Sequence, residues 1–242
     1  METMWNELAK YYDLMYSWKP YRKETEEIVA LVRKYKRSPG NDLLDVGCGT
    51  GGHIKSLRRH FRVVGTDASE RMLAIAREKF PSLTFLRQDM MSLHLGRRFD
   101  VIVCLFAAIA YTRTYANLKR TVARFTEHLT DGGVVIIEPF VDPRLFKSGY
   151  FDGLYFDRPD VKLCRLVRST LRGNIATLDC HFLLATKSGI RTYRDVHRIG
   201  CFTPRRVLRI MKECGLRSKY RADGLMPGRG LYIGVKSRRH AQ

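Results

Sequence analysis

The segment 43–52, Leu-Leu-Asp-Val-Gly-Cys-Gly-Thr-Gly-Gly, has residue types and a spacing that suit the binding of a nucleotide cofactor. It begins as an apolar strand and ends in four glycines within six residues. Because glycine has no Cβ, such a turn bends sharply and lets a ligand approach the backbone. A strand, a glycine turn and a helix in this order are the context that a nucleotide site requires. The candidate binding residues in the turn are Gly47, Cys48, Gly49 and Gly51.

The glycine spacing alone fits two cofactors, and Asp45 separates them. Gly47, Gly49 and Gly52 match G-x-G-x-x-G, the fingerprint of dinucleotide-binding turns. A carboxylate two positions before the first glycine would repel a pyrophosphate, whereas it would attract an ammonium group. S-adenosylmethionine (SAM) carries an ammonium group at its amino-acid end. Asp45 therefore favours SAM over NAD.

Two further carboxylates follow the next predicted strands. Asp67 lies 22 residues after Asp45, where a carboxylate can accept hydrogen bonds from both hydroxyls of a ribose. Both cofactors contain that ribose, so Asp67 indicates a nucleoside without choosing between them. Asp89 follows the third predicted strand, and taken alone it is equally explained as a carboxylate that caps its own loop.

These residues need a scaffold in which strands and helices alternate. The hydrophobic spacing predicts an amphipathic helix over 24–36, and the apolar, β-branched runs predict strands that are buried on both faces of a parallel sheet. A doubly wound sheet of this kind binds its ligands at the carboxyl ends of the strands. The predicted strands are 41–46, 61–66, 83–86, 99–106 and 134–138, and the helices between them are 54–60, 69–80 and 116–129, with a turn at Asp131-Gly132-Gly133.

The pattern changes after Pro139. Three long strands are predicted at 161–171, 175–186 and 190–202, and hairpin signals at Gly173-Asn174 and Lys187-Ser188-Gly189 join them into an antiparallel insertion. A helix with Pro204 in its first turn and two last strands complete the sheet. We expect a single domain made of an N-terminal lid and helix (1–40), a cofactor-binding core (41–138), the insertion for the substrate (139–202) and a final helix with the last strands (203–242).

The motifs resemble those of class I SAM-dependent methyltransferases. Residues 44–51 are similar to the first motif of that family, Gln88-Asp89-Met90 to its adenine-contacting segment, and Phe99–Ile102 to its fourth strand. The resemblance implies an α/β fold of the Rossmann-like class I type, with a mostly parallel seven-stranded sheet and an antiparallel β insertion after strand five. It also implies SAM as the cofactor, bound by Asp45, Gly47, Cys48, Gly49, Gly51, Asp67, Ala68, Asp89, Met90 and Leu105.

The chain as a whole resembles the N,N-dimethyltransferases that act on nucleotide-linked amino sugars. This resemblance implies N-methylation of an amino sugar, or of a similar amine carried on a nucleotide. The family often has Glu-Pro-Trp where Glu138-Pro139-Phe140 stands here, a departure that bears on the identity of the acceptor. The similar stretches are 12–16, 138–140, 179–182, 195–197 and 228–235.

Two tyrosines are candidates for the catalytic centre. Methyl transfer from a sulfonium is an in-line displacement, so the acceptor must be held opposite the leaving sulfur, and an amine must be neutral to react. Tyr12 lies in an N-terminal segment that can fold over the cofactor as a lid. Tyr111 follows the strand at 99–106, and some members of the resembling family have a His at that position. A phenol, with a reference pKa of about 10, orients an amine rather than deprotonating it. Ordinary core aromatics are the alternative for both.

His181 and His197 lie on the second and third predicted strands of the insertion. If a three-residue loop joins these strands, Asp179 lies opposite His197 and Asp195 lies opposite His181. All four side chains then share one face, where the carboxylates can tune a general base. A two-residue turn would shift the register by one residue and separate them. Structural or exposed cross-strand pairs are the alternative.

The net charge of +20 is concentrated in the last third of the chain. Residues 161–242 contain 19 Lys and Arg against four Asp and Glu. A solvated basic surface explains this excess, and so does an anionic partner, either a phosphorylated small molecule or a nucleic acid. Arg229, in the turn Pro227-Gly228-Arg229-Gly230, can bind a phosphate of the substrate through two parallel hydrogen bonds. A solvated turn arginine is the alternative.

Two rival functions remain at this point. Methyltransferases that act on the amino groups of bases usually have a [D/N]-P-P-[Y/F] sequence after strand four, and this chain has Phe-Ala-Ala-Ile-Ala-Tyr at 106–111. This difference argues against a nucleic-acid methyltransferase, whereas the basic last third of the chain favours one. A nucleic-acid or protein methyltransferase is the second hypothesis, and a SAM-binding protein without catalysis is the third. The sequence also leaves a homodimer open.

The cellular setting is predicted from absences in the sequence. The six cysteines include no C-x-x-C pair, so we expect reduced core thiols, no metal site and a cytoplasmic location. The first ten residues do not have the pattern of a signal peptide. The longest apolar run, Val101–Tyr111, is too short to cross a bilayer, and no membrane partner is expected.

Overall fold

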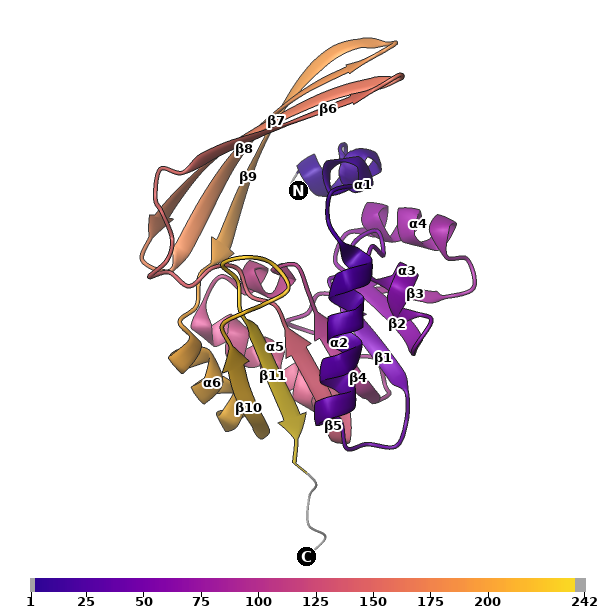
Figure 1. Cartoon of the computed structure of the whole chain (residues 1–242), viewed down its shortest axis with the longest axis vertical. Helices are drawn as coiled ribbons and strands as arrows, with labels where there is room; N and C mark the ends of the chain where they lie inside the picture. Colours follow the sequence, from indigo (N-terminus) through magenta and orange to yellow (C-terminus); the bar gives the residue numbers. More distant parts are fainter. Residues whose placement is uncertain (1–2, 238–242) are drawn as a thin grey trace, which may run out of the picture.

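The computed structural model describes residues 3–237 and contains a seven-stranded sheet with the order β10-β11-β5-β4-β1-β2-β3 (Figure 1). The outermost residues of the first and last expected segments, 1–2 and 238–242, lie outside the described residues. The sheet is mostly parallel, and only β11 runs antiparallel to its neighbours β5 and β10. Its strands are β1 (Asp42–Val46), β2 (Arg62–Asp67), β3 (Thr84–Arg87), β4 (Phe99–Cys104), β5 (Leu129–Ile137), β10 (Leu216–Arg221) and β11 (Leu231–Lys236). This arrangement is the predicted α/β fold.

Helices cover both faces of this sheet because successive strand residues point to opposite sides. Leu43 belongs to the apolar cluster beneath three of the helices, α2, α3 and α4, and Leu44 belongs to the cluster beneath the other two, α5 and α6. Each helix contributes one apolar stripe to its cluster. The helices are α2 (Tyr21–Tyr35), α3 (Ile54–Leu57), α4 (Glu70–Lys79), α5 (Tyr115–His128) and α6 (Pro204–Glu213).

The insertion is a four-stranded antiparallel sheet that projects from the C-terminal edge of the parallel strands (Figure 1). Its strands are β6 (Phe151–Arg158), β7 (Val161–Arg172), β8 (Ile175–Thr186) and β9 (Gly189–Gly200). The sequence predicted the last three strands but not β6, because Asp152, Gly153 and Asp157 interrupt its apolar pattern. Three short helices of the N-terminal segment, η1 (Thr3–Trp5), η2 (Ala9–Tyr11) and α1 (Tyr12–Met15), pack against the insertion.

The register between β8 and β9 differs from the one that was expected. Lys187 and Ser188 form a two-residue turn, so Thr186 pairs with Gly189 and the whole ladder moves by one residue. Gly189 has a φ of 119°, which lets the strand begin directly after the turn. The predicted pairs Asp179–His197 and His181–Asp195 are therefore wrong. Because the side-chain period of a strand is two, this shift places His181 and His197 on opposite faces.

Two smaller features also differ from the prediction. Asp131-Gly132-Gly133 lies within β5 rather than in a separate turn, and the pairing of β4 with β5 shifts between Phe99 and Val101 to accommodate these residues. Gly132 has a φ of 78°, which explains why the local sequence resembles a turn. Within residues 3–237, no helix is long and apolar enough to cross a membrane.

Candidate active site

A cavity of about 380 Å³ opens at the carboxyl ends of β1, β2 and β4. Its volume is that of a small-molecule site, and it lies at the edge where open α/β sheets bind ligands. Most of the predicted cofactor and catalytic residues line it: Tyr12, Gly47, Gly49, Asp67, Ala68, Asp89, Met90, Leu105 and Tyr111. Asp45 and Cys48 line a small hollow of about 30 Å³ that shares several residues with this cavity.

The glycine turn is held against β2 by its own backbone. The amide groups of Gly47 and Cys48 both donate to Thr66 O, at 2.7 and 2.9 Å. Gly47 has a φ of 73°, and a Cβ on it would lie 2.7 Å from Ala108 Cβ. Gly51 lines neither hollow, and a Cβ there would lie 2.8 Å from the Phe80 ring. Gly51 therefore packs closely against Phe80 within the turn, and its contact with the cofactor stays a prediction.

Asp67 is fixed in position by the turn that it supports. Its two carboxylate oxygens accept hydrogen bonds from the amides of Gly49 and Ser69, each at 2.9 Å. Burial raises the pKa of Asp67, and these backbone hydrogen bonds oppose that rise. Asp89 also lines the cavity, and it accepts a hydrogen bond of 2.8 Å from Met91 N. Asp89 therefore caps its loop, as the simpler interpretation of this residue requires, and faces the cavity as well.

Asp45 is a buried carboxylate in the small hollow beside the cavity. Its exposed fraction is 3%, and burial together with the charge of Asp67 raises its pKa to about 7. A cation placed beside it would stabilise the charged form. The ammonium group of SAM is such a cation, and the Asp67 carboxylate can accept hydrogen bonds from the hydroxyls of its ribose. The two carboxylates, Asp45 and Asp67, therefore fit the ammonium group and the ribose of SAM.

The N-terminal segment closes over this cavity. Trp5 lines it, and the Trp5 ring lies 5.7 Å from the Tyr12 ring and 6.0 Å from the Tyr111 ring. On the other side, Ser69 Oγ donates to Trp5 O at 2.8 Å, which ties the segment to the loop that follows β2. Met4 N donates to Asp195 Oδ2 of the insertion at 2.6 Å. The segment is thus a bridge between the cofactor loop and β9, and Trp5 was not among the predicted site residues.

Three polar side chains form a chain that ends at the cavity. The hydroxyl of Tyr111 lies 3.0 Å from His197 Nδ1, and His197 Nε2 lies 3.6 Å from Asp195 Oδ2. His197 and Asp195 are both buried, at 3% and 5% exposed. The tyrosine hydroxyl is thus within hydrogen-bond distance of one ring nitrogen, and the carboxylate lies near the other at ion-pair distance, where it can stabilise a protonated imidazole.

His181 takes no part in this arrangement. It points away from the cavity on the outer face of the insertion, where its Nε2 lies 3.2 Å from Asp179 Oδ1. Arg194 also binds both oxygens of Asp179, at 2.9 Å each, and lowers the pKa of that carboxyl. The predicted patch of two carboxylate–imidazole pairs is wrong, and the pairing of Asp179 with His181 is an exposed structural contact.

Comparison with known proteins identifies the family. Residues 43–133 match the methyltransferase domain family. The chain is 37% identical to a dTDP-3-amino-3,4,6-trideoxy-alpha-D-glucopyranose N,N-dimethyltransferase of Streptomyces venezuelae, over 94% of this chain and 97% of that protein. It is 34% identical to a dTDP-3-amino-3,6-dideoxy-alpha-D-glucopyranose N,N-dimethyltransferase of Streptomyces fradiae, over 95% and 91% of the two chains. The chain is a SAM-dependent methyltransferase of this family.

Solved structures agree with this assignment. DesVI of Streptomyces venezuelae superposes on the methyltransferase with a TM-score of 0.88 at 36% identity, covering 95% of this chain and 98% of the other. SAM-bound CalS10, an amino pentose methyltransferase from Micromonospora echinaspora, superposes with a TM-score of 0.81 at 31% identity, covering 90% and 92%. The predicted class I fold, with its antiparallel insertion, and the predicted cofactor are confirmed.

A buried ionic cluster of the methyltransferase supports the end of the site near Asp45, and it was not among the predicted features. Lys19 Nζ and His53 Nε2 both contact the carboxylate of Glu24, at 2.5 and 2.7 Å. Burial opposes the charge of Glu24, but hydrogen bonds from His53 and Lys19 outweigh it and lower its pKa. Lys19 Nζ also lies 4.3 Å from the centre of the Phe106 ring. The cluster joins α2 to the loop after β4, where Phe106 lines the cofactor cavity.

Two arginines lie near Phe106 and Tyr16, whose rings are 5.0 Å apart. The Arg229 guanidinium lies between the rings of Phe106 and Phe140, at 5.3 and 5.1 Å, and burial lowers its pKa. Arg165 of β7 lies 3.5 Å from the hydroxyl of Tyr16. Arg229 Nη1 and Arg165 Nε are buried, and neither has a hydrogen-bond partner among the described residues. Arg229 is therefore not a solvated turn arginine, and both side chains have donor capacity for an anion.

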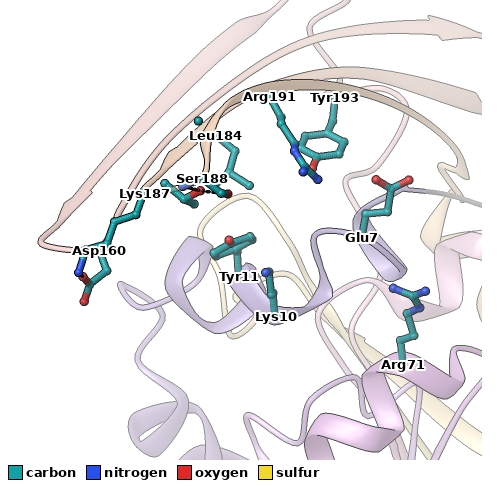
Figure 2. Close-up of a pocket in the computed structure, with 12 residues that line it drawn as sticks. Glu7, Lys10, Tyr11, Arg71, Asp160, Leu184, Lys187, Ser188, Arg191 and Tyr193 are labelled. Carbon is teal, nitrogen blue, oxygen red and sulfur yellow. Dashed lines mark hydrogen bonds and ion pairs between the residues drawn. The ribbon is translucent and has the colours of Figure 1, made fainter.

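A second, larger hollow contains none of the predicted site residues. It measures about 620 Å³ and lies between the N-terminal segment and the turn that joins β8 to β9 (Figure 2). Both acidic and basic side chains line it, and Lys187 Nζ lies 3.1 Å from Asp160 Oδ1. In Figure 2, Arg191 and Tyr193 extend from β9 above Tyr11 and Lys10 of the N-terminal segment. The glycine turn and its carboxylates belong to the other cavity.

The position of Asp45 predicts a pH dependence of SAM binding. Below pH 7 a growing fraction of Asp45 is protonated, and pairing with the ammonium group then requires the loss of that proton. We expect the dissociation constant of SAM to rise about five- to tenfold between pH 7.5 and pH 6, measured by isothermal titration calorimetry. Asp45→Asn should bind SAM at least about tenfold more weakly at pH 7.5 and should lose most of this pH dependence.

Asp223→Asn is the matched control, because Asp223 is exposed and lines neither the cofactor cavity nor the small hollow that contains Asp45. It should bind SAM as the wild type does at each pH. A wild-type affinity that is constant from pH 6 to pH 7.5, together with an unchanged affinity in Asp45→Asn, would show that Asp45 does not hold the ammonium group.

Proposed function

We propose that this methyltransferase transfers methyl groups from SAM to the amine of an amino sugar carried on a nucleotide. The observation that carries this proposal is the chain from Tyr111 through His197 to Asp195, because it brings a proton acceptor to the cofactor cavity. The names of the nearly full-length relatives support the substrate class, since both act on dTDP-linked amino sugars.

In this proposal the cofactor lies along the carboxyl ends of the strands. Asp45 binds the ammonium group, Asp67 binds the ribose hydroxyls, and Asp89 and Met90 contact the adenine. Tyr12 and Trp5 cover the cofactor from the N-terminal segment and exclude water. SAM supplies an electrophilic methyl group on a sulfonium, and the remaining task of the protein is to orient and deprotonate the acceptor.

The polar chain performs that task. An aliphatic amine is largely protonated at neutral pH and must lose a proton before it can attack the methyl carbon. The amine donates to the Tyr111 hydroxyl, and as its proton moves to that oxygen, the tyrosine proton passes to His197 Nδ1. Asp195 then stabilises the imidazolium, in the way a carboxylate supports a histidine base. The neutral amine forms its new bond to the methyl carbon while the carbon–sulfur bond breaks and its electron pair stays on sulfur.

The two arginines provide a site for the nucleotide part of the substrate. Arg229 was expected to bind a phosphate, and its buried, unused Nη1 supports that role. Arg165 adds a second guanidinium, and Tyr16 lies beside it. A diphosphate carries the charge and the acceptor oxygens that two such groups require. The stacking of Arg229 on Phe106 fixes this anion site at the edge of the cofactor cavity.

The chain of Tyr111, His197 and Asp195 predicts a selective loss of turnover. With a dTDP-linked amino sugar as substrate, His197→Ala should lower kcat by about 100-fold, because general base assistance contributes on this order. The dissociation constant of SAM should stay within about twofold of the wild type. The loss should shrink as the pH rises above 8, because more of the substrate amine is then already neutral. Steady-state kinetics across this pH range measures both effects.

His181→Ala is the control for that experiment, because His181 lies on the opposite face of the same sheet. It should retain wild-type turnover at every pH. If His197→Ala also keeps full turnover with its true substrate, the proposed proton path is wrong.

The arginine pair predicts a change in KM that depends on the nucleotide. Arg229→Ala and Arg165→Ala should each raise KM for a nucleotide-linked amino sugar at least tenfold, because a buried charge-assisted hydrogen bond is lost. Neither substitution should change turnover of the same amino sugar without its nucleotide. Arg205→Ala, on the exposed start of α6, should leave both values unchanged. Equal losses with both substrates would contradict a phosphate site.

A nucleic-acid methyltransferase is the second candidate, favoured by the basic last third of the chain. The direct test offers labelled SAM with amino sugars, sugar nucleotides, small amines and bulk tRNA. We expect label to enter a nucleotide-linked amino sugar. Label in tRNA alone would overturn the substrate proposal, and SAM binding without transfer to any of these acceptors would favour a binding protein.

A further inference from the structure

Three rings meet where the proposed proton path, the chain of Tyr111, His197 and Asp195, reaches the cofactor cavity. The Trp5 ring lies 5.7 Å from the His197 ring and 6.0 Å from the Tyr111 ring, and the rings of Tyr111 and His197 are 6.2 Å apart. Their planes meet at 62°, 75° and 89° in the same order, which is the edge-to-face geometry that aromatic pairs prefer. Trp5 therefore packs against both side chains of the hydrogen bond between Tyr111 and His197.

The residue before Trp5 contacts the third member of the proton path. Met4 N donates to Asp195 Oδ2 at 2.6 Å, and the same oxygen lies 3.6 Å from His197 Nε2. Met4 is buried in the apolar cluster between the N-terminal segment and the insertion. Two consecutive residues of η1 thus reach all three members of the path.

The proton path depends on the planes of its rings, and the backbone alone does not fix them. The last side-chain torsion of a tyrosine or a histidine is broad, so each ring can turn about its bond to Cβ. A turn of the His197 ring would move Nδ1 away from the Tyr111 hydroxyl and Nε2 away from Asp195. A bulky ring packed edge-on against the imidazole leaves little room for this rotation. Trp5 holds that place.

Trp5 is itself anchored to the loop that follows β2. Ser69 Oγ donates to Trp5 O at 2.8 Å, and Ser69 N donates to Asp67 Oδ1 at 2.9 Å. Asp67 is the carboxylate assigned above to the ribose of the cofactor. The Trp5 ring is therefore positioned from the cofactor side of the cavity and acts on the acceptor side.

We propose that Trp5 is a positioning residue for the methyl transfer, which holds the His197 imidazole and the Tyr111 hydroxyl in the orientation that receives the proton of the acceptor. This inference rests on the proposed function, because it assigns Trp5 to the proton path described there. Trp5 itself neither gives nor takes a proton. A Trp5 that only covers the cofactor would instead support turnover to the same extent with or without His197.

A double-mutant cycle tests the proposal, with kcat measured at saturating SAM and a saturating dTDP-linked amino sugar. Trp5→Ala should lower kcat about tenfold, because the base assistance is only partly lost. In a His197→Ala background the same substitution should lower kcat by less than about twofold, since the group that Trp5 positions is gone. Trp5→Phe keeps an aromatic edge and should stay within about threefold of the wild type.

Two further variants separate positioning from folding. Trp5→Leu keeps apolar bulk without a ring and should lose kcat as Trp5→Ala does, while a calorimetric titration with SAM shows that each variant is folded. Trp18→Ala is the matched control, since Trp18 is 50% exposed and lines neither the cofactor cavity nor the small hollow beside it, and it should keep the wild-type kcat.

The outcomes distinguish this proposal from the proposed function. A wild-type kcat in Trp5→Ala and Trp5→Leu would overturn the role of Trp5, and so would a tenfold loss that persists in the His197→Ala background. Either result, with turnover lost in His197→Ala alone, leaves the proton path intact. Full turnover in His197→Ala alone would overturn the proton path and the role of Trp5 with it.

Discussion

The site depends on one geometric constraint, which is that parallel strands end at the same edge of their sheet. β1 and β2 are neighbours, so Asp45 and Asp67 approach each other in a buried environment. Burial and the charge of Asp67 raise the pKa of Asp45 to about 7. In the empty site, the state in which both carboxylates are charged is therefore electrostatically unfavourable. A cationic ligand relieves this cost, and the fold therefore selects for the charge of the cofactor before any specific contact forms.

The same constraint explains why the cofactor end could be predicted from the sequence. A strand, its glycine turn and the next helix are local, and the cavity residues of the cofactor-binding core lie within a few positions of strand ends, whereas Trp5 and Tyr12 come from the N-terminal segment. Gly51 shows the limit of this reasoning, because its φ of 81° and its contact with Phe80 give it a packing role that the motif does not distinguish from binding. The motif predicts the turn, and only the packing tells which glycine faces the ligand.

The insertion could be predicted as an antiparallel sheet, but its register could not. Lys187-Ser188-Gly189 is compatible with a three-residue loop and with a two-residue turn followed by a glycine that begins β9. The difference is one residue, yet it decides whether His181 and His197 share one face of the insertion or lie on opposite faces. Trp5, Lys19 and Arg165 were missed for another reason, since each functions through partners that are far away in sequence. Burial and pairing of an isolated lysine or arginine leave no pattern in the sequence.

The arrangement of charge within the site reflects the two reactants. Asp45 and Asp67 lie at one end, where a sulfonium cofactor with an ammonium group would be held. Arg165 and Arg229 lie beyond Phe106, where an anionic nucleotide would be held. The acceptor amine must be uncharged when it reacts, and in the proposed mechanism it contacts the neutral hydroxyl of Tyr111. A carboxylate placed there would stabilise the ammonium form of the amine and oppose the reaction. In the proposed mechanism Asp195 lies behind Tyr111 and His197 and stabilises the imidazolium, so the amine can lose its proton without a carboxylate beside it that would favour its unreactive form.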